Sequence, residues 1–316
     1  MLTLMDRKRA LPIIALATLL AVDIVLVLWA LWPAASVSAT GATPPAPSPT
    51  VSGSASASAS ASPSPSASPT ASPTPISRVL VAVDRRTAWL ATTGTCEEPG
   101  QLQVTTDGGA TWTASDTPAA ITRIRTSGRA EGWVVAGVGK DCTMRVFTTG
   151  GAGDEWSDPA SASAAWARVA EDARRAIRPG GGPVTPCGRA EVLDLASIGR
   201  VVASVLCADG TVRTTEDGGE TWPEAFRVEG ALAFALRADG RGTIASVTTE
   251  CDGTTVTALV DGQPEESVCV EGAEATPGDV SISLSDQAAW LVAGDAAFTA
   301  PEVTGRWVPT KGALGS

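Results

Sequence analysis

The chain has 316 residues, with 34 acidic and 23 basic side chains, no histidine, no tyrosine and a net charge of −11. A balance of this sign argues against nucleic-acid partners, because the phosphate backbone would be repelled. Without histidine a Ser-His-Asp triad cannot form, and the chain has no C-x-x-C pair, so we expect neither a metal site nor a cofactor.

An apolar run with one acidic residue spans residues 11–32. At the rise of an α-helix it is about 33 Å long, which is enough to cross the hydrocarbon core of a bilayer. Three basic residues at positions 7–9 precede it, and the positive-inside rule keeps them in the cytoplasm. The sequence therefore predicts a cytoplasmic tail over residues 1–10, a single transmembrane helix over 11–32 and an extracytoplasmic remainder. A cleaved signal peptide is the alternative, with Val37 and Ala39 at the cleavage site.

The composition changes twice after the apolar run. Residues 33–76 are rich in Ser, Ala, Pro and Thr and carry no charge, so they cannot bury a core and are expected to form a disordered linker. Residues 77–316 regain apolar and charged side chains. They are numerous enough for one all-β domain with a substantial core.

A short motif occurs twice in this domain, as TTDGGATW at residues 105–112 and TEDGGETW at residues 215–222. Both copies match Ser/Thr-x-Asp-x-Gly-x-Thr-Trp, and they resemble the Asp-box (BNR) hairpin of sialidases, sortilin-type receptors and photosystem assembly propellers. The resemblance implies a β-propeller in which the motif locks a tight turn: a short carboxylate accepts backbone N–H groups, glycine supplies unusual backbone angles, and tryptophan packs into the sheet. The residues with this structural role would be Asp107, Gly109, Thr111 and Trp112 in the first copy, and Asp217, Gly219, Thr221 and Trp222 in the second.

Tryptophan spacing sets the period of the repeat. Trp89 to Trp133 and Trp112 to Trp156 are each 44 residues apart, the length of a four-stranded blade. Units with alternating or continuous apolar strands begin near residues 77, 121, 190, 232 and 280. The fold class expected is therefore an all-β propeller of about five four-stranded blades, with six as the alternative.

An insertion separates the second and third units. Trp166, Val169, Ala173 and Ile177 share one face at helical spacing, which predicts a helix near residues 160–178. A degenerate sixth blade is the alternative for this segment. Trp166 is a candidate for contact with a partner, and packing against its own blades is the competing interpretation.

All six cysteines lie in the expected extracytoplasmic domain, which predicts three disulfides. Six cysteines allow fifteen pairings, and we favour sequential pairing of neighbours along the chain. The candidates are Cys96, Cys142, Cys187, Cys207, Cys251 and Cys269.

A sialidase activity does not fit the chain. That chemistry needs a tyrosine nucleophile, and the Arg-x-Pro motif of those enzymes is also absent. For ligand contact the inner strands of a propeller are the usual place. Arg123 and Arg125 alternate onto one face of such a strand, and Asp194 interrupts another, so these three are the candidate channel residues. Alternatively they satisfy one another or the backbone.

The sequence therefore predicts a non-catalytic binding or scaffolding module, anchored in the cell membrane through residues 11–32, with a protein or glycan partner at the propeller face. The alternative is a glycan hydrolase of the envelope that uses a pair of carboxylates. The scarcity of Lys, Asn, Tyr and His is typical of a bacterial, GC-rich source.

Overall fold

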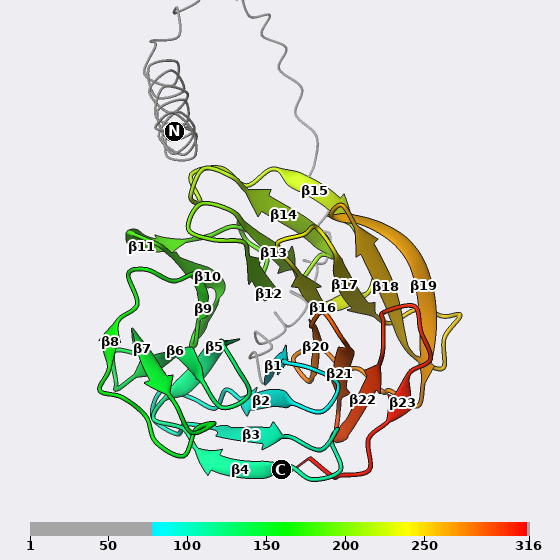
Figure 1. Ribbon diagram of the computed structural model, residues 1–316. Helices are drawn as coiled ribbons and strands as arrows, with labels where there is room; N and C mark the ends of the chain where they lie inside the picture. The colour runs from blue at the N-terminus through cyan, green and yellow to red at the C-terminus, as the bar shows by residue number, and fades with distance from the viewer. Residues whose placement is uncertain (1–77, 315–316) are drawn as a thin grey trace, which may run out of the picture. The chain divides into compact units, whose positions relative to one another are not determined.

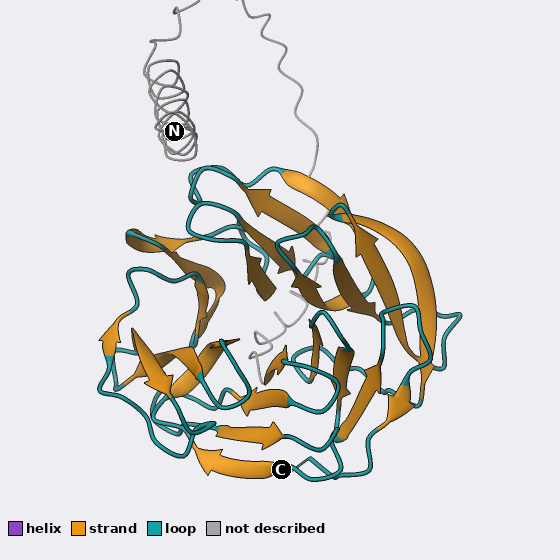
Figure 2. Cartoon of the chain, in the orientation of Figure 1, coloured by secondary structure: helices purple, strands orange, loops and turns teal. Residues whose placement is uncertain are grey.

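The computed structural model describes residues 78–314. This part of the chain is all β, with strands β1 to β23 and no helix (Figures 1 and 2). Within it, no helix is long and apolar enough to span a membrane. The predicted cytoplasmic tail, transmembrane helix and linker, residues 1–76, lie outside the described residues.

The strands form six sheets that are arranged as blades around a central axis (Figure 1). Blade 1 consists of β1 (Arg78–Ala82), β2 (Ala88–Thr92), β3 (Gln101–Thr105) and β4 (Thr113–Asp116). Blade 2 consists of β5 (Ala120–Thr126), β6 (Gly132–Val138), β7 (Thr143–Thr149) and β8 (Ala160–Ser161). Blade 3 has three strands, β9 (Ala167–Val169), β10 (Asp172–Arg178) and β11 (Gly181–Val184).

The remaining blades repeat the four-stranded plan. Blade 4 consists of β12 (Val192–Ser197), β13 (Ala203–Cys207), β14 (Thr211–Thr215) and β15 (Glu224–Arg227). Blade 5 consists of β16 (Ala231–Leu236), β17 (Gly242–Ser246), β18 (Gly253–Val260) and β19 (Gln263–Glu271). Blade 6 consists of β20 (Val280–Leu284), β21 (Ala289–Ala293), β22 (Ala296–Ala300) and β23 (Val308–Pro309). The all-β propeller is confirmed, and six blades, the alternative to about five, is the number present.

The helix predicted near residues 160–178 is wrong, because this segment contains β8, β9 and β10. Its apolar residues fit a helical face, but the glycines at 180–182 close a hairpin between β10 and β11, with Gly180 at a φ of 78°. Ala167 and Ala176 are buried as strand residues while Arg174 and Arg175 are exposed. Tertiary packing between blades 2 and 4 thus overrides the local periodicity.

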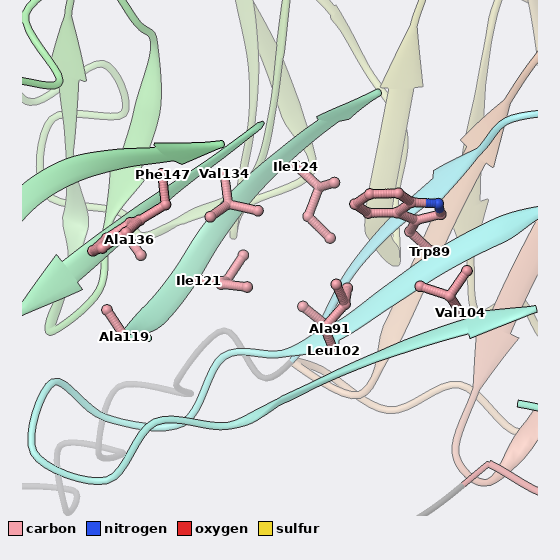
Figure 3. Packing of buried hydrophobic residues seen from close by; sticks show 10 residues of the cluster. All are labelled: Trp89, Ala91, Leu102, Val104, Ala119, Ile121, Ile124, Val134, Ala136 and Phe147. Atoms are coloured by element: carbon pink, nitrogen blue, oxygen red, sulfur yellow. The ribbon is translucent and has the colours of Figure 1, made fainter. Parts of the chain in front are cut away.

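The core consists of apolar layers between adjacent blades. Between blades 1 and 2, for example, Trp89 and Leu102 face Ile121, Val134 and Phe147 (Figure 3). Similar clusters lie between blades 2 and 3, 4 and 5, 5 and 6, and 6 and 1. Each blade therefore covers the apolar face of the next, which a single sheet could not bury alone.

Two tryptophans, Trp89 and Trp290, also tie one blade to the next by a hydrogen bond. Nε1 of Trp89 donates to the Arg129 carbonyl at 3.1 Å, and Nε1 of Trp290 donates to the Asp84 carbonyl at 2.9 Å. Each acceptor lies in the loop after the inner strand of the following blade. The large ring fills the interface while its one polar atom is satisfied.

The ring closes between blades 6 and 1 without a shared blade, since each sheet is built from consecutive strands. Two serines of β20 accept hydrogen bonds from the backbone of β1. The Leu80 N–H donates to Ser281 Oγ at 3.1 Å, and the Ala82 N–H donates to Ser283 Oγ at 3.0 Å. Arg78 forms an ion pair with Asp279 at 2.8 Å. Closure therefore depends on side chains, which makes this junction sensitive to substitution.

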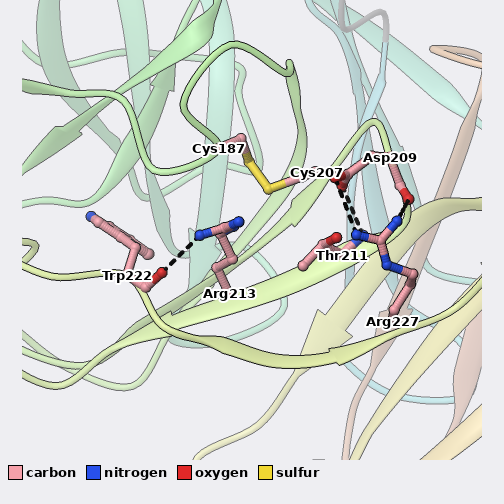
Figure 4. The surroundings of a disulfide bond; sticks show 7 residues. All are labelled: Cys187, Cys207, Asp209, Thr211, Arg213, Trp222 and Arg227. Carbon is pink, nitrogen blue, oxygen red and sulfur yellow. Dashed lines mark hydrogen bonds and ion pairs between the residues drawn. A yellow bond between two sulfur atoms is a disulfide. The ribbon is translucent and has the colours of Figure 1, made fainter. Parts of the chain in front are cut away.

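Three disulfides confirm the sequential pairing of the cysteines. Cys96 bonds to Cys142, joining loops of blades 1 and 2, and Cys251 bonds to Cys269 within blade 5. Cys187, in the turn before β12, bonds to Cys207 at the end of β13 (Figure 4). The described residues contain no free cysteine.

Candidate ligand-binding channel

The two turns that carry the repeated motif have the same hydrogen-bond pattern. In the first, Asp107 Oδ1 accepts the N–H groups of Ala110 and Thr111 at 2.9 and 3.0 Å, and Asp107 Oδ2 accepts the Thr111 hydroxyl at 2.7 Å. Thr105 Oγ1 accepts the Gly109 N–H at 2.9 Å. Hydrogen bonds from the backbone and side chain of Thr111 lower the pKa of Asp107 to about 2.

The second turn repeats this arrangement around Asp217. Its carboxylate accepts the Glu220 and Thr221 N–H groups at 2.9 and 3.0 Å and the Thr221 hydroxyl at 2.6 Å. The Thr221 hydroxyl is the first cause of a lowered pKa of Asp217, followed by that of Thr215. In both turns the carboxylate is occupied by donors of the turn itself, so these residues serve the architecture.

The tryptophans that follow the turns pack across blade boundaries. Trp112 meets Trp290 of blade 6 edge to face at a centroid distance of 6.1 Å, and Trp222 meets Trp166 of blade 3 in the same way at 5.7 Å. A third turn, after β7, keeps half of the pattern: the Gly153 N–H donates to Thr149 Oγ1 at 3.1 Å. No aspartate stands at its centre, where Gly151 occurs.

The inner strands enclose a central channel with a volume of about 860 Å³. All six blades contribute to its wall, among them Arg123 and Arg125 of blade 2, Arg168 of blade 3 and Asp194 of blade 4. A space of this size is in the range of small-molecule sites. The structure therefore places the three candidate channel residues of the sequence in one wall.

Blade 3 differs from the other blades in this wall, because its inner strand β9 runs antiparallel to the inner strand β12 of blade 4. Nε1 of Trp166, just before β9, donates at 3.1 Å to the carbonyl of Arg200, which lies beyond the end of β12. Arg168, within β9, donates to the Leu193 carbonyl near the start of β12. In a four-stranded blade this direction belongs to the second strand. Blade 3 thus lacks the first, innermost strand that the other five blades have.

Two arginines of blade 2 reach across the inner side of this incomplete blade. Arg123 Nη1 donates to the Trp166 carbonyl and Nη2 donates to Ser197 Oγ, both at 2.8 Å. Arg125 Nη2 donates to the Ser197 carbonyl at 2.8 Å. They join blade 2 to blade 4 directly, in the region that an innermost strand of blade 3 would occupy.

The guanidinium groups are buried without carboxylate partners. Arg123 is 6% exposed and Arg168 is 4% exposed. Among the ion pairs of residues 78–314, none involves Arg123, Arg125, Arg168 or Asp194. Burial, followed by the charge of Arg125, lowers the pKa of Arg123 to about 9. Burial lowers the pKa of Arg168 too, and the charge of Asp194 opposes this.

Asp194 forms no ion pair with the arginines and accepts hydrogen bonds from backbone groups instead. Its Oδ1 accepts the Leu195 N–H at 2.8 Å and its Oδ2 accepts the Phe234 N–H of blade 5 at 3.0 Å. It therefore fixes the backbone of blades 4 and 5. The fourth candidate, Trp166, is 2% exposed and packs within the protein, so its surface is not open to a partner.

The sequence argument missed Arg168, because the residue was assigned to a helix. Strand β9 has only three residues, Ala167–Val169, and its burial does not alternate, so the sequence carries no local signal for a strand there. Glu171, in the same blade, accepts the Cys96 N–H at 3.1 Å. It lies with both sulfurs of the Cys96–Cys142 pair, but these are bonded to each other and offer no thiolate to a metal.

Two carboxylates lie near the channel mouth. Asp239 accepts hydrogen bonds from Arg241 Nη2 at 2.8 Å and from Arg237 Nη2 at 3.3 Å, and Arg237 Nη2 also contacts Asp286. The side-chain hydrogen bond from Arg241 is the largest cause that lowers the pKa of Asp239 to about 2. Both acids are thus held by guanidinium groups.

No protein-family model matches this chain, and no curated protein matches it. Among solved structures, it is similar to YCF48 bound to D1 peptide, with 18% identity over 75% of this chain and 83% of the other, at a TM-score of 0.38. A GH74 xyloglucanase from Xanthomonas campestris has 12% identity over 73% of this chain and 37% of its own, with a TM-score of 0.30. BamB from Moraxella catarrhalis has 11% identity over 72% of this chain and 59% of its own, with a TM-score of 0.26.

Proposed function

We propose that the chain is a non-catalytic binding or scaffolding module of the Asp-box repeat type, held at the cell envelope through residues 11–32. Its ligand enters the central channel or rests on the adjoining face of the propeller. The repeat assignment is supported by the hydrogen bonds within the turns of Asp107 and Asp217. A partner at the propeller face is a protein or a glycan.

The observation that carries a non-catalytic role is the state of the channel carboxylates. Of the described residues that line the channel, only Asp194 and Asp239 are acidic. Asp194 accepts two backbone N–H groups, and the pKa of Asp239 is low because Arg241 and Arg237 bond to it. A glycosidase needs one carboxylic acid that is protonated near neutral pH to protonate the leaving group. The low pKa of Asp239 does not suit that task, and both oxygens of Asp194 are already occupied by backbone donors.

One observation favours the hydrolase as the second candidate. Asp239 and Asp286 contact the same Nη2 of Arg237, so two carboxylates lie close together at the mouth of the channel. Retaining glycosidases carry such a pair about 5–5.5 Å apart. Hydrogen bonds from Arg241 and Arg237 lower the pKa of Asp239 to about 2, which suits a nucleophile but not an acid.

The test is a binding array of glycans, cell-wall fragments and envelope proteins, probed with the full-length chain in detergent. Any bound glycan is then followed by mass spectrometry for cleaved product. Binding without turnover is the expected result. Turnover that is lost in Asp239→Asn and Asp286→Asn variants, but kept in the exposed control Asp116→Asn, would establish the hydrolase instead.

The anchor is tested separately, because it concerns residues outside the described part. Membranes from cells that express the full-length chain are washed with alkaline carbonate and treated with protease from the outside. We expect the chain to stay with the membrane and its propeller to be cleavable only from the extracytoplasmic side. Release into the wash, or a shortened N-terminus that begins near residue 40, would support the cleaved signal peptide.

A further inference from the structure

The channel wall at blades 2, 3 and 4 contains more positively charged side chains than negatively charged ones. Arg123, Arg125 and Arg168 lie there with Asp194, whose carboxylate is turned to backbone N–H groups. The three guanidinium groups donate only to carbonyl or hydroxyl oxygens. Asp194 offers one negative charge to three guanidinium groups, and burying the excess positive charge costs free energy that neutral acceptors offset only in part. The wall is therefore prepared for an anion that the protein itself does not supply.

Arg123 adds an independent observation. Its side chain is 94% buried by the exposure given above, it lines the channel, and its Nε has no hydrogen-bond acceptor. Buried N–H groups are nearly always paired in native proteins, so this orphan donor adds to the uncompensated positive charge behind the channel wall. Arg125 is the most accessible of the three and uses only Nη2 within the protein. Its other N–H groups are free to bind a ligand.

The incomplete blade 3 explains why the charge is here. The innermost strand that the other blades have would close the space between β5 and β12. Instead, the arginines of β5 extend into that space and reach Ser197 of β12. Guanidinium groups occupy the space that this backbone would have filled, and they bind carboxylates and phosphates with two parallel hydrogen bonds.

We propose that the central channel binds the carboxylate or phosphate group of a small anionic ligand, with Arg125 as the contacting residue and Arg123 and Arg168 as the buried charges behind it. The net charge of the chain and the volume of the channel both favour a small ligand. The chain as a whole carries −11, which repels an extended polyanion but admits a compact one to a locally positive channel. This proposal rests on the proposed binding function and names its ligand class.

The experiment is isothermal titration of the full-length chain in detergent with inorganic phosphate and with succinate, at constant ionic strength. Poly-glutamate serves as the extended polyanion. Saturable binding of phosphate or succinate is expected, and which of the two binds more tightly identifies the group. An Arg125→Gln variant should bind at least about tenfold more weakly. The matched control is Arg145→Gln, which makes the same charge change on the exposed face of β7.

Several results would overturn the proposal. These are no saturable binding of either small anion by the wild type, equal losses in the Arg125→Gln and Arg145→Gln variants, or poly-glutamate binding that Arg125→Gln does not change. If Arg125→Gln shows an altered circular dichroism spectrum, Arg125→Lys replaces it, because lysine keeps the charge and loses the planar fork. If an uncharged ligand from the binding array binds the Arg125→Gln variant and the wild type equally, the proposed binding function is supported and the proposed anionic ligand is contradicted.

Discussion

Asp107 and Asp217 show how one carboxylate can specify a turn. Each accepts two backbone N–H groups and a threonine hydroxyl, so donors that a tight turn would leave to water are paired within the turn. The glycines on the other side supply positive φ angles, 79° at Gly109 and 90° at Gly219. The ionised carboxylate and the glycine φ angles thus stabilise the same turn conformation. This conformation fixes the position at which the following tryptophan enters the blade interface.

Replacing Asp107 by Asn should lower the melting temperature in a pH-dependent manner. The pKa of Asp107 falls from an ordinary 3.8 to about 2 on folding, because the turn's donors favour the ionised form. The ionised carboxylate therefore stabilises the fold above about pH 4, and this contribution is lost as the pH falls through about 2. Thermal unfolding of wild type and variant between pH 6 and pH 2 measures the difference, which should shrink towards pH 2.

The control for that substitution is Asp116→Asn, which changes the same side chain at an exposed position of β4. It should leave the melting temperature close to that of the wild type throughout the range. A constant difference between Asp107→Asn and wild type from pH 6 to pH 2 would contradict the assigned role of the charge.

The adjacent glycines of the second turn provide a matched pair of substitutions. Gly218 and Gly219 have φ angles of 77° and 90°, so alanine is strained at both, by about 1–2 kcal/mol. A Cβ at position 218 meets nothing within 4 Å, whereas at position 219 it would lie 2.9 Å from Trp166 Cη2. Crowding of this kind adds about 1–3 kcal/mol. Urea unfolding should therefore show a larger loss for Gly219→Ala than for Gly218→Ala; equal losses would mean that Trp166 moves aside freely.

At the scale of elements, the blades were predictable where their strands alternate and end in recognisable turns. Blade 1, with its complete motif and its two tryptophans, is present as predicted from the sequence. Blade 3 was predicted from the sequence only as the alternative to a helix, because β9 has three residues and gains its position from contacts with Arg123 and Leu193 in other blades. Such long-range contacts leave no local periodicity. For the same reason Arg168 was missed, while Arg123 and Arg125, on a seven-residue strand, were found.

The disulfides also act at this scale, and the sequence separation ranks them. Cys96 and Cys142 are 46 residues apart and join two blades, whereas Cys251 and Cys269 are 18 apart within blade 5. The chain-entropy argument assigns about 4 kcal/mol to the longer loop and about 3 kcal/mol to the shorter one. The Cys96→Ala/Cys142→Ala double variant should thus unfold at a lower urea midpoint than Cys251→Ala/Cys269→Ala. The reverse order would indicate that the unfolded chain without the Cys96–Cys142 bond keeps structure between residues 96 and 142.

For the whole molecule, the decisive feature is how the ring closes. Because no blade is shared between the two ends of the propeller, blades 6 and 1 are held by Ser281, Ser283 and the Arg78–Asp279 pair on the inner side. On the outer side, the segment after β23 continues onto blade 1. There the Gly312 N–H donates to the Gly109 carbonyl at 2.8 Å, and Leu314 is buried in the cluster between these blades.

That outer segment should contribute measurably to stability. Ending the chain after Pro309 removes the backbone hydrogen bonds of Thr310 and Gly312 and the burial of Leu314. The Leu314 side chain alone is worth about 1.5–3 kcal/mol, and each hydrogen bond adds about 1 kcal/mol, so the free energy of unfolding should fall by about 3–5 kcal/mol. Urea unfolding of the full-length and shortened chains in detergent measures the loss. The exposed substitution Lys311→Ala is the control and should leave the urea midpoint unchanged. If the shorter chain unfolds at the wild-type midpoint, the contacts of β1 with β20 close the ring by themselves, and the channel arginines are held in place by the inner strands alone.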